Sequence, residues 1–510
     1  MERIISYDLG TGGIKASLFD EEGCSIASSF HQYETFYKDG LIHEQRPDDW
    51  WDAVVASTHN LLEKSGIRPN EIAGISISGH SLGVVPLDKQ GRLLRERTPI
   101  WSDGRAYDQA AKFFNIYDYD KWYLRTGNGF PAHLYSVFKI LWYKDNEPEL
   151  FEKTYKFLGT KDYINYRLTG VMATDHSYAS GSGVYSLLDA KYDDELLTAS
   201  GVSQDLLADI LPSIAIIGRV SKEGAYATGL VEGTKVVCGG VDNSCMALGA
   251  ACYSPGRVYT SLGTSAWIAV SDSKPIVDVG IRPFVFAHVV EGQFASAVSI
   301  FSAGNSLRWI RDNICPDLVA QAEQEGRDPY QLMDRLAEQS PIGANKLIFN
   351  PNLAGGSSFE ASQNIKGGYA GLVLGHNRSD LIRSAMEGIA MNLGVVFRLL
   401  KKLCPVSDKM LMVGGGSKSK FWRQIFADVY QCDIVKTNVD QDAASLGAAA
   451  LAAVGLGIWE GFDNLDRVHQ VQDISKPLEQ NVKEYEKYIA AFEYVAQKYA
   501  DIGDMLASID

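Results

Sequence analysis

The sequence predicts an α/β protein built from two related halves. Segments with strand character alternate with segments of helical periodicity along the whole 510-residue chain, a pattern typical of α/β folds. An extended run, a Leu-Gly-Thr turn and a second extended run occur twice, at 8–20 and at 261–272. A chain of this length also exceeds what one core usually accommodates. We therefore expect two duplicated domains, 1–248 and 249–510, that face one another across a deep cleft.

The first half opens with three strand-like runs, at 3–9, 14–20 and 24–30, joined by glycine turns. They predict an antiparallel meander. The run 46–66 has apolar residues at helical spacing and ends in Gly66, which predicts a helix, and 72–78 predicts another strand.

The second half contains a long helical stripe over 379–403 and a strand, triple-glycine turn, helix and strand over 409–435. The last periodic segment, 478–502, predicts an amphipathic helix whose apolar side packs on the domain or forms a homodimer face. The stretch 443–457 is rich in Gly and Ala and too short to cross a membrane, so close helix packing is expected there.

Composition excludes several classes of partner. Hydrophobic residues make up 46% and charged residues 22% of the chain, and the formal net charge is -15 without any Lys/Arg-rich tract. These values predict an ordinary globular protein that binds neither nucleic acid nor an anionic membrane. The N-terminus shows no basic segment followed by a long apolar one, so we expect no signal peptide and a cytoplasmic location.

The two glycine hairpins are candidate phosphate sites. A Gly-Thr tip offers backbone N-H groups and a hydroxyl without a bulky side chain in the way. Ordinary glycine hairpins would have the same sequence. Asp8 enters the first turn, where a carboxylate would suit Mg²⁺ or cap the turn without a metal. Lys15, on the returning strand, would bind phosphates or point to solvent.

Asp242 follows an apolar strand-like run in "GGVDNS". A carboxylate held at a rigid strand end could serve as the general base for a hydroxyl. A helix N-cap explains the same residue equally well. The turn "GGGSKS" at 414–419 precedes a helix, as nucleotide-contacting turns do, but it matches neither a Walker A motif nor a dinucleotide fingerprint.

Longer motifs resemble the FGGY family of sugar kinases. "GGYAGLVLGHNRSDLIRSAMEG" at 367–388 is similar to the family's C-terminal signature, and "SVFKILWYKDN" at 136–146 is similar to its N-terminal one, with a departure at Leu134. "IHEQRPDDWW", "IWSDGR" and "SLGTSAW" occur in the expected order. The resemblance implies the actin-like (ribonuclease H-like) fold shared with hexokinases and heat-shock chaperones, with the sugar and the base in the first domain and the nucleotide in the second.

The resemblance also implies site residues. Asp242 would accept the proton of the attacking sugar hydroxyl, and Asp8 would organise Mg²⁺. The residues expected at ATP are Thr11, Gly12, Gly13, Lys15, Gly263, Thr264, Gly304, Gly415, Gly416 and Ser417. Positioning, metal charge and exclusion of water would supply most of the catalysis.

Within the family, "SISGHSLGVVPLDKQGRLL" and "IWSDGR" are most similar to xylulokinase-type members. Ser81 and Leu82 stand where those carry Met-His, and Ser102 stands where they carry Asn. A changed hydrogen-bonding partner can shift discrimination by orders of magnitude. His80, Ser81, Trp101 and Asp103 are the residues expected at the sugar. For these, a structural histidine, a core tryptophan and a helix-capping aspartate are the alternatives.

The predicted function is an ATP-dependent kinase for a small sugar, foremost a ketopentose. Gluconate, erythritol, fuculose and ribulose remain alternative substrates. An actin-like ATPase without sugar kinase activity would use the same phosphate loops, and a sugar sensor would bind without turnover.

Overall fold

The computed structural model describes residues 2–357, 359–440 and 442–509. Its contacts divide the chain into two compact units. The first unit contains Met1–Pro255, Ser271–Ser296 and Asp442–His469, and the second contains Gly256–Val270, Ala297–Gln441 and Gln470–Asp510. The chain therefore passes between the units several times. The assignment of roles to 1–248 and 249–510 stays a prediction.

The first unit has a central sheet that begins with the predicted meander. Strands β1 (Arg3–Gly10), β2 (Gly13–Phe19) and β3 (Ser25–Gln32) pair in antiparallel fashion, and β6 (Ile72–Gly79) lies parallel to β1 on its other side. The sheet continues through β15 (Lys235–Val237) to β14 (Ile216–Arg219), and β16 (Gly240–Val241) also pairs with β6.

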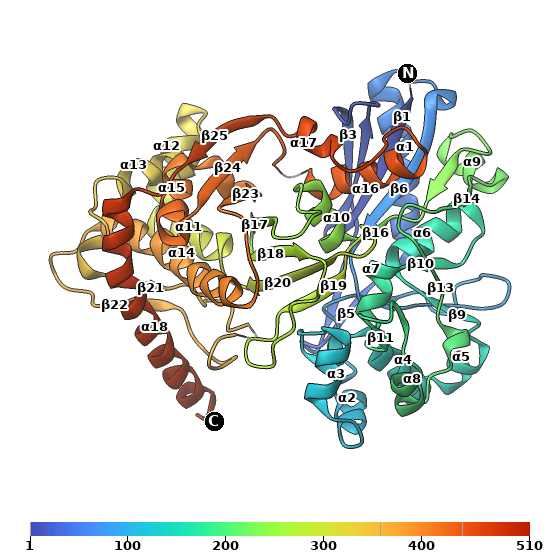
Figure 1. Cartoon of the computed structure of the whole chain (residues 1–510), viewed down its shortest axis with the longest axis horizontal. Helices are drawn as coiled ribbons and strands as arrows, with labels where there is room; N and C mark the ends of the chain where they lie inside the picture. The colour runs from blue at the N-terminus through green and yellow to red at the C-terminus, as the bar shows by residue number, and fades with distance from the viewer. Residues whose placement is uncertain (1, 358, 441, 510) are drawn as a thin grey trace. The chain divides into compact units, whose positions relative to one another are not determined.

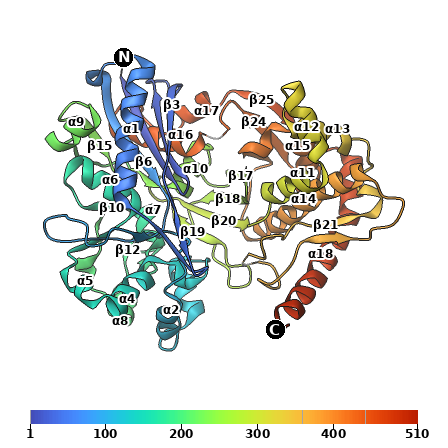
Figure 2. The same ribbon diagram turned by 180° about the vertical axis from the view of Figure 1, so that it is seen from behind.

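The two faces of this sheet differ because side chains alternate along a strand. Ile5, Tyr7 and Leu9 of β1 belong to the buried core that also includes apolar residues of α1 (Pro47–Ser65) and α6 (Thr160–Thr169). The opposite face carries α16 (Ala443–Gly455), which packs on β1 and β6 and against α10 (Asp242–Gly249) (Figures 1 and 2). Close packing of the Ala- and Gly-rich α16 is thereby confirmed.

The remaining elements of the first unit lie outside this sheet. They are β4 (Phe36–Lys38), β5 (Ile42–Gln45), β7 (Val85–Leu87), β8 (Thr98–Pro99), α2 (Tyr107–Phe114), α3 (Tyr119–Thr126), α4 (Ser136–Asn146), α5 (Pro148–Lys153), β9 (Lys156–Leu158), β10 (Ala173–Asp175), α7 (His176–Ala179), β11 (Tyr185–Ser186), β12 (Lys191–Tyr192), α8 (Asp194–Ser200), β13 (Asp209–Leu211), α9 (Lys222–Thr228), β19 (Phe284–Ala287) and α17 (Asn464–Val468).

The second unit repeats the strand plan of the first. Its sheet contains β20 (Phe294–Ile300), β18 (Ala266–Asp272), β17 (Val258–Leu262), β23 (Lys409–Val413), β24 (Asp433–Thr437) and β25 (Val471–Ser475) in that order. β17 and β18 form the second glycine hairpin, and β23 lies parallel to β17. The order β20-β18-β17-β23-β24 matches β3-β2-β1-β6-β15 of the first unit. The predicted duplication is thus confirmed.

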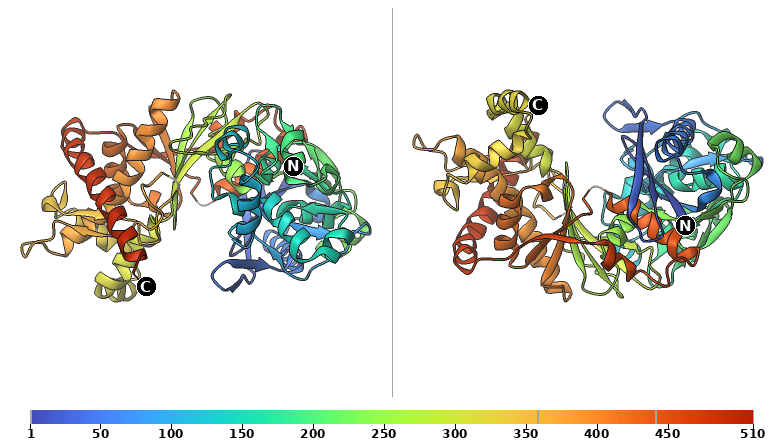
Figure 3. Two further views of the ribbon diagram at one scale, coloured as in Figure 1. Left: turned by 90° about the horizontal axis from the view of Figure 1, so that it is seen from below. Right: turned by 90° about the horizontal axis from the view of Figure 1, so that it is seen from above.

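Helices of the second unit pack around its long helix α14 (Arg378–Leu403), whose inner face is apolar as expected. The C-terminal helix α18 (Glu479–Ala507) runs along α14 and α15 (Lys420–Tyr430) (Figure 3). The unit is completed by α11 (Gly304–Ile314), α12 (Pro316–Glu325), α13 (Pro329–Ala337), β21 (Ile348–Asn350) and β22 (Gly368–Ala370).

Within the part of the chain that the structure describes, no helix combines the length and the apolar composition that a membrane crossing requires.

Candidate active site

Asp8 and Asp242 come together at one end of the first unit's sheet. β1 pairs with β6 and β6 pairs with β16, so that Asp8 lies beside Ser78, which in turn lies beside the strand that leads into Asp242. The Ser78 hydroxyl donates to Asp8 Oδ1 at 2.7 Å. Burial, followed by the charge of Asp8, raises the pKa of Asp242 to about 7. Burial also raises the pKa of Asp8. A carboxylate with a pKa near neutrality suits a general base.

The segment that carries Asp242 is fixed by buried polar groups. Val241 N-H donates to Ser177 Oγ at 2.9 Å, and the Ser177 hydroxyl donates to Asp175. Asp175 is held by Lys161 at 3.0 Å. Gly239 has a φ of 74°, and a Cβ there would overlap the carbonyl oxygen of Ile77. The backbone before Asp242 is therefore pinned to β6 on one side and to α7 on the other.

Lys15 and Thr11 both have protein partners at the first hairpin. The Lys15 ammonium forms an ion pair with Asp442, at the start of α16. Burial lowers the pKa of Lys15, and the charge of Asp8 opposes that shift. The Thr11 hydroxyl accepts from Trp101 Nε1 at 2.9 Å, while Gly12 at the tip is exposed. At this hairpin Thr11, which is expected at the phosphates, is thus bonded to Trp101, which is expected at the sugar.

The four residues expected at the sugar lie in two loops of the first unit and differ in exposure. Trp101 is 37% exposed, whereas His80, Ser81 and Asp103 are buried. His80 Nδ1 lies 3.2 Å from Thr160 Oγ1, and burial lowers the pKa of His80 to about 4, so its imidazole is neutral.

Asp103 already has hydrogen-bonding partners within the protein. Its carboxylate accepts from Arg105 Nε at 2.7 Å and from the backbone of His43 at 2.7 Å. Its expected contact with the sugar stays a prediction.

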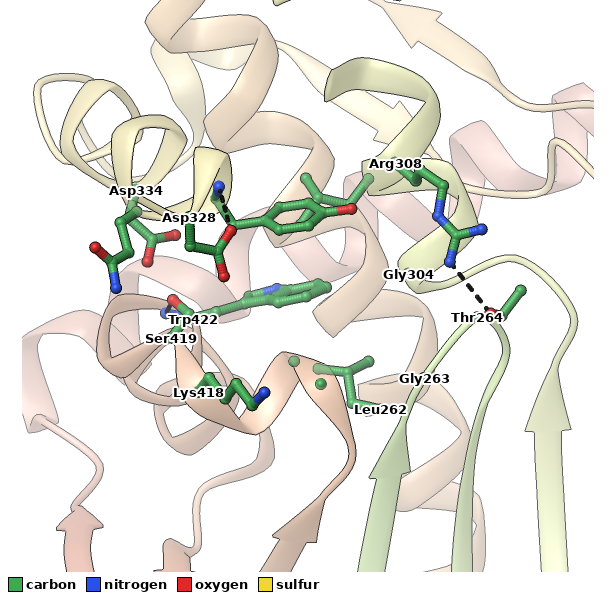
Figure 4. A pocket seen from close by; sticks show the side chains of 15 residues that line it. Leu262, Gly263, Thr264, Gly304, Arg308, Asp328, Asp334, Lys418, Ser419 and Trp422 are labelled. Atoms are coloured by element: carbon green, nitrogen blue, oxygen red, sulfur yellow. Dashed lines mark hydrogen bonds between the residues drawn. The ribbon is translucent and has the colours of Figure 1, made fainter. Parts of the chain in front are cut away.

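The second unit contains a cavity of about 430 Å³, within the range of small-molecule sites. It lies between the second hairpin, the triple-glycine turn and helices α11, α13 and α15. Figure 4 shows the Trp422 ring flat within it, with Asp328 on one side and Lys418 on the other, and Arg308 reaching Thr264. The lining residues are Leu262, Gly263, Thr264, Gly304, Leu307, Arg308, Asp328, Tyr330, Gln331, Asp334, Gly415, Gly416, Lys418, Ser419 and Trp422.

The structure brings five of the predicted nucleotide residues to this cavity: Gly263, Thr264, Gly304, Gly415 and Gly416. Gly304 N-H donates to Gly263 O at 2.9 Å, and a Cβ at Gly304 would overlap that oxygen. Ser417 is instead buried in the turn, where its hydroxyl donates to Gly414 O at 2.8 Å.

The sequence did not predict a role at the nucleotide for the side chains of α13 and α15 that line the cavity. Asp328 caps the start of α13, and Trp422 is a buried residue of α15. Burial raises the pKa of Asp334 to about 6, and the hydrogen bond from Ser419 opposes the rise. No local motif marks these residues, because two helices distant in sequence, α13 and α15, bring them to one cavity.

Comparison with known proteins assigns the family. The profile described as "FGGY family of carbohydrate kinases, N-terminal domain" matches residues 3–249, and the corresponding C-terminal domain matches residues 258–456. The chain belongs to the FGGY family of carbohydrate kinases. As such it is a phosphotransferase that uses ATP to phosphorylate a small sugar, which confirms the function class and the fold expected from the sequence.

Relatives of this FGGY kinase carry several substrate names, among them xylulose and gluconate. The xylulose kinase of Bacillus subtilis is 30% identical over 512 residues, 100% of this chain and 99% of that protein. The gluconokinase of Bacillus licheniformis is 30% identical over 492 residues, 96% of this chain and 94% of that protein. The ligand-bound crystal structure of xylulose kinase from Lactobacillus acidophilus matches with a TM-score of 0.88 and 26% identity, over 100% of this chain and 99% of that one.

Proposed function

We propose that this FGGY kinase transfers the γ-phosphate of ATP to a hydroxyl of a ketopentose such as xylulose. The observation that carries the proposal is that two buried cations in contact with the segments of the expected sugar residues already have partners. Arg105 pairs with Asp103 and Glu44, and Lys139 donates to the backbone carbonyls of Leu82 and Ile100.

A neutral ketose needs only hydrogen-bonding partners for its hydroxyls. His80 is neutral, and its Nε2 has no hydrogen-bonding partner among the described residues. An aldonate such as gluconate carries a carboxylate that would need one of these cations. Withdrawing Arg105 from Asp103 leaves an unpaired buried charge at a cost of about 3–5 kcal/mol, and withdrawing Lys139 leaves buried carbonyl oxygens without a donor. The paired cations therefore favour the ketose over the sugar acid. The similarities do not separate the two substrates, since a xylulose kinase and a gluconokinase are each 30% identical to this chain.

Asp242 is the proposed general base, since its raised pKa and its fixed backbone suit proton removal from the attacking hydroxyl. Trp101, the most exposed of the expected sugar residues, is proposed to form one wall of the sugar site. Thr11, which accepts from Trp101, would hold the Trp101 ring in a fixed position relative to the first glycine hairpin.

The donor set around Asp8 fits Mg²⁺. Among the residues that the structure describes, no three His, Cys, Asp or Glu side chains gather as a metal cluster. Mg²⁺ with a nucleotide needs only one or two carboxylates, together with phosphates and waters. Asp8 supplies one carboxylate, whose charge burial disfavours. Bound there, the ion would offset charge on the transferring phosphoryl group.

The second unit's cavity is the proposed nucleotide site. The Trp422 ring offers an aromatic face for a base, and Arg308 and Lys418 provide positive charge near Thr264 and Gly416. Phosphoryl transfer relies on positioning and electrostatics rather than covalent help, which this combination of groups supplies.

The test is coupled ADP release with xylulose, ribulose, fuculose, gluconate, erythritol and glycerol. We expect the highest kcat/KM with a ketopentose, and a value for gluconate at least about 100-fold lower, given the cost of an unpaired buried charge. The highest kcat/KM with gluconate would refute the ketopentose while leaving the kinase intact. ADP release that does not depend on any sugar would refute both.

A cytoplasmic location and a homodimer belong to the same proposal. The last turns of α18 expose Ile502, Met505 and Leu506, a surface that a second copy could cover. Light scattering tests the dimer, and cell fractionation tests the location.

A further inference from the structure

Lys139 on α4 is a buried lysine that the proposed chemistry does not use. Its side chain is fully buried. The ammonium donates to Ile100 O at 2.7 Å, to Leu82 O at 3.0 Å and to Trp101 O at 3.3 Å. An ammonium has three N-H donors, so these three carbonyl oxygens account for all of them. Burial lowers the pKa of Lys139 to about 7, and the charge of Asp103 opposes that shift.

Leu82 is the centre of a strained turn. Gly83 N-H donates to Ser81 O at 2.8 Å, which closes a three-residue γ-turn, and Leu82 has a φ of 62°. A γ-turn with a positive central φ is rare and strained for a residue with a Cβ. The Leu82 side chain is nevertheless buried in the core beside Val84 and Phe138. Such a turn persists only where its surroundings hold it.

The carbonyls that Lys139 binds belong to two separate loops. Leu82 follows His80 and Ser81 at the end of β6, whereas Ile100 and Trp101 follow β8. The residues expected at the sugar are therefore divided between the two segments that this one ammonium joins. At this turn the sequence departs from xylulokinase-type members, since Ser81 and Leu82 stand where those carry Met-His.

We infer that Lys139 is a positioning residue for the sugar: it holds the strained Leu82 turn against the Trp101 loop and so fixes the spacing between the two sides of the sugar site. This inference rests on the proposed sugar site. Lys139 itself touches no reacting atom. Its effect passes through the carbonyls of Leu82 and Trp101, and hence through the side chains of Ser81 and Trp101.

A methionine at this position would keep most of the volume and lose all three hydrogen bonds. Three buried carbonyl oxygens would then lack their donor, and buried polar groups without a partner are avoided. These carbonyl groups could regain partners only if the two loops moved toward water or if the strained turn opened. The predicted consequence is a sugar site with altered spacing and an unchanged nucleotide site, since the cavity of the second unit contains none of these residues.

The experiment compares steady-state kinetics of Lys139→Met, Lys144→Met and Trp101→Ala with the parent enzyme, using D-xylulose or the sugar that gives the highest turnover in the panel. Lys144 is the matched control because it lies on the same helix, is exposed, and donates to Gly201 O at 3.3 Å at the surface. We expect Lys139→Met to raise the sugar KM about 10-fold or more while the KM for ATP changes less than about twofold. Lys144→Met should leave both values unchanged.

Equal changes in both KM values, or none in either, would overturn the inference. Should Lys139→Met fail to fold by circular dichroism, Lys139→Gln, which keeps an amide donor, is measured against the same criteria. Trp101→Ala tests the proposed sugar site independently of Lys139. If it leaves the sugar KM unchanged, the proposed sugar site is wrong; if it raises the sugar KM while Lys139→Met does not, only the role of Lys139 is wrong.

Discussion

The carboxylate of Asp8 lies near enough to Asp242 for its charge to raise the pKa of Asp242, in addition to the larger rise caused by burial. Two neighbouring acids cannot both ionise as easily as one alone. Near neutral pH this keeps Asp242 close to its midpoint, where it can take a proton from a hydroxyl and release it again.

The pH dependence of kcat/KM for the sugar follows from this pKa. The working base is the ionised form of Asp242, and its fraction falls as the pH drops through about 7. We therefore expect kcat/KM to rise with pH and to level off above about pH 7, because this profile reports ionisations of the free enzyme. A profile that is flat down to about pH 5, near the ordinary range of carboxyl groups, would show that Asp242 is not the base.

Ser177→Ala should lower kcat and leave the sugar KM nearly unchanged. The substitution removes the acceptor of Val241 N-H, and a buried donor without a partner costs about 1–3 kcal/mol. Since Asp242 follows directly, we expect a loss of about 10-fold in kcat. Ser57→Ala is the control, because Ser57 is buried in α1 and its hydroxyl has no partner within the described residues. Equal kinetics for the two variants would contradict a role of Ser177 in placing the base.

The fold could be predicted because its signals are local. Apolar residues at helical spacing defined α14 and α18, and Gly66 ended α1 as expected. The repeated hairpin indicated the duplication, since each copy begins the same strand order. The return of 442–469 to the first unit could not be predicted, because the packing of α16 on β1 and β6 joins segments from opposite ends of the chain.

Lys15→Met should raise the KM for ATP by about 10-fold or more, since a hydrogen bond to a charged group contributes about 1.5–3 kcal/mol. Lys15 is held at the first hairpin by Asp442. Asp442→Asn removes the competing charge and keeps the lysine, so the KM for ATP should stay the same or fall. If both variants raise that KM equally, the ion pair is structural and Lys15 does not bind phosphate.

Gly304→Ala should weaken ATP binding and stability together. A Cβ at this position would overlap Gly263 O, the atom that accepts from Gly304 N-H, and overpacking typically costs about 1–3 kcal/mol. We expect a higher KM for ATP and an unchanged KM for the sugar, with a lower midpoint in thermal unfolding. Gly375→Ala is the control, because a Cβ there meets no atom within 4 Å. An unaltered KM for ATP would place the nucleotide elsewhere.

The candidate site was only partly predictable. Asp8, Asp242 and the glycine turns carry recognisable motifs, and the structure brings five of the predicted nucleotide residues to one cavity. Lys15 was expected to face phosphates or solvent, yet it pairs with Asp442, 427 residues away along the chain. Helix packing likewise brings Arg308, Asp328 and Trp422 to the cavity. Such packing leaves no local pattern in a sequence.

The most direct test of the account replaces Asp242 with Ala and measures sugar binding by calorimetry beside ADP release from the same preparation. We predict that the sugar still binds within a few-fold of the parent affinity, whereas turnover falls by about 10²–10⁴-fold, the usual contribution of a general base. Turnover within tenfold of the parent enzyme would contradict the central claim that Asp242 activates the sugar hydroxyl for phosphoryl transfer.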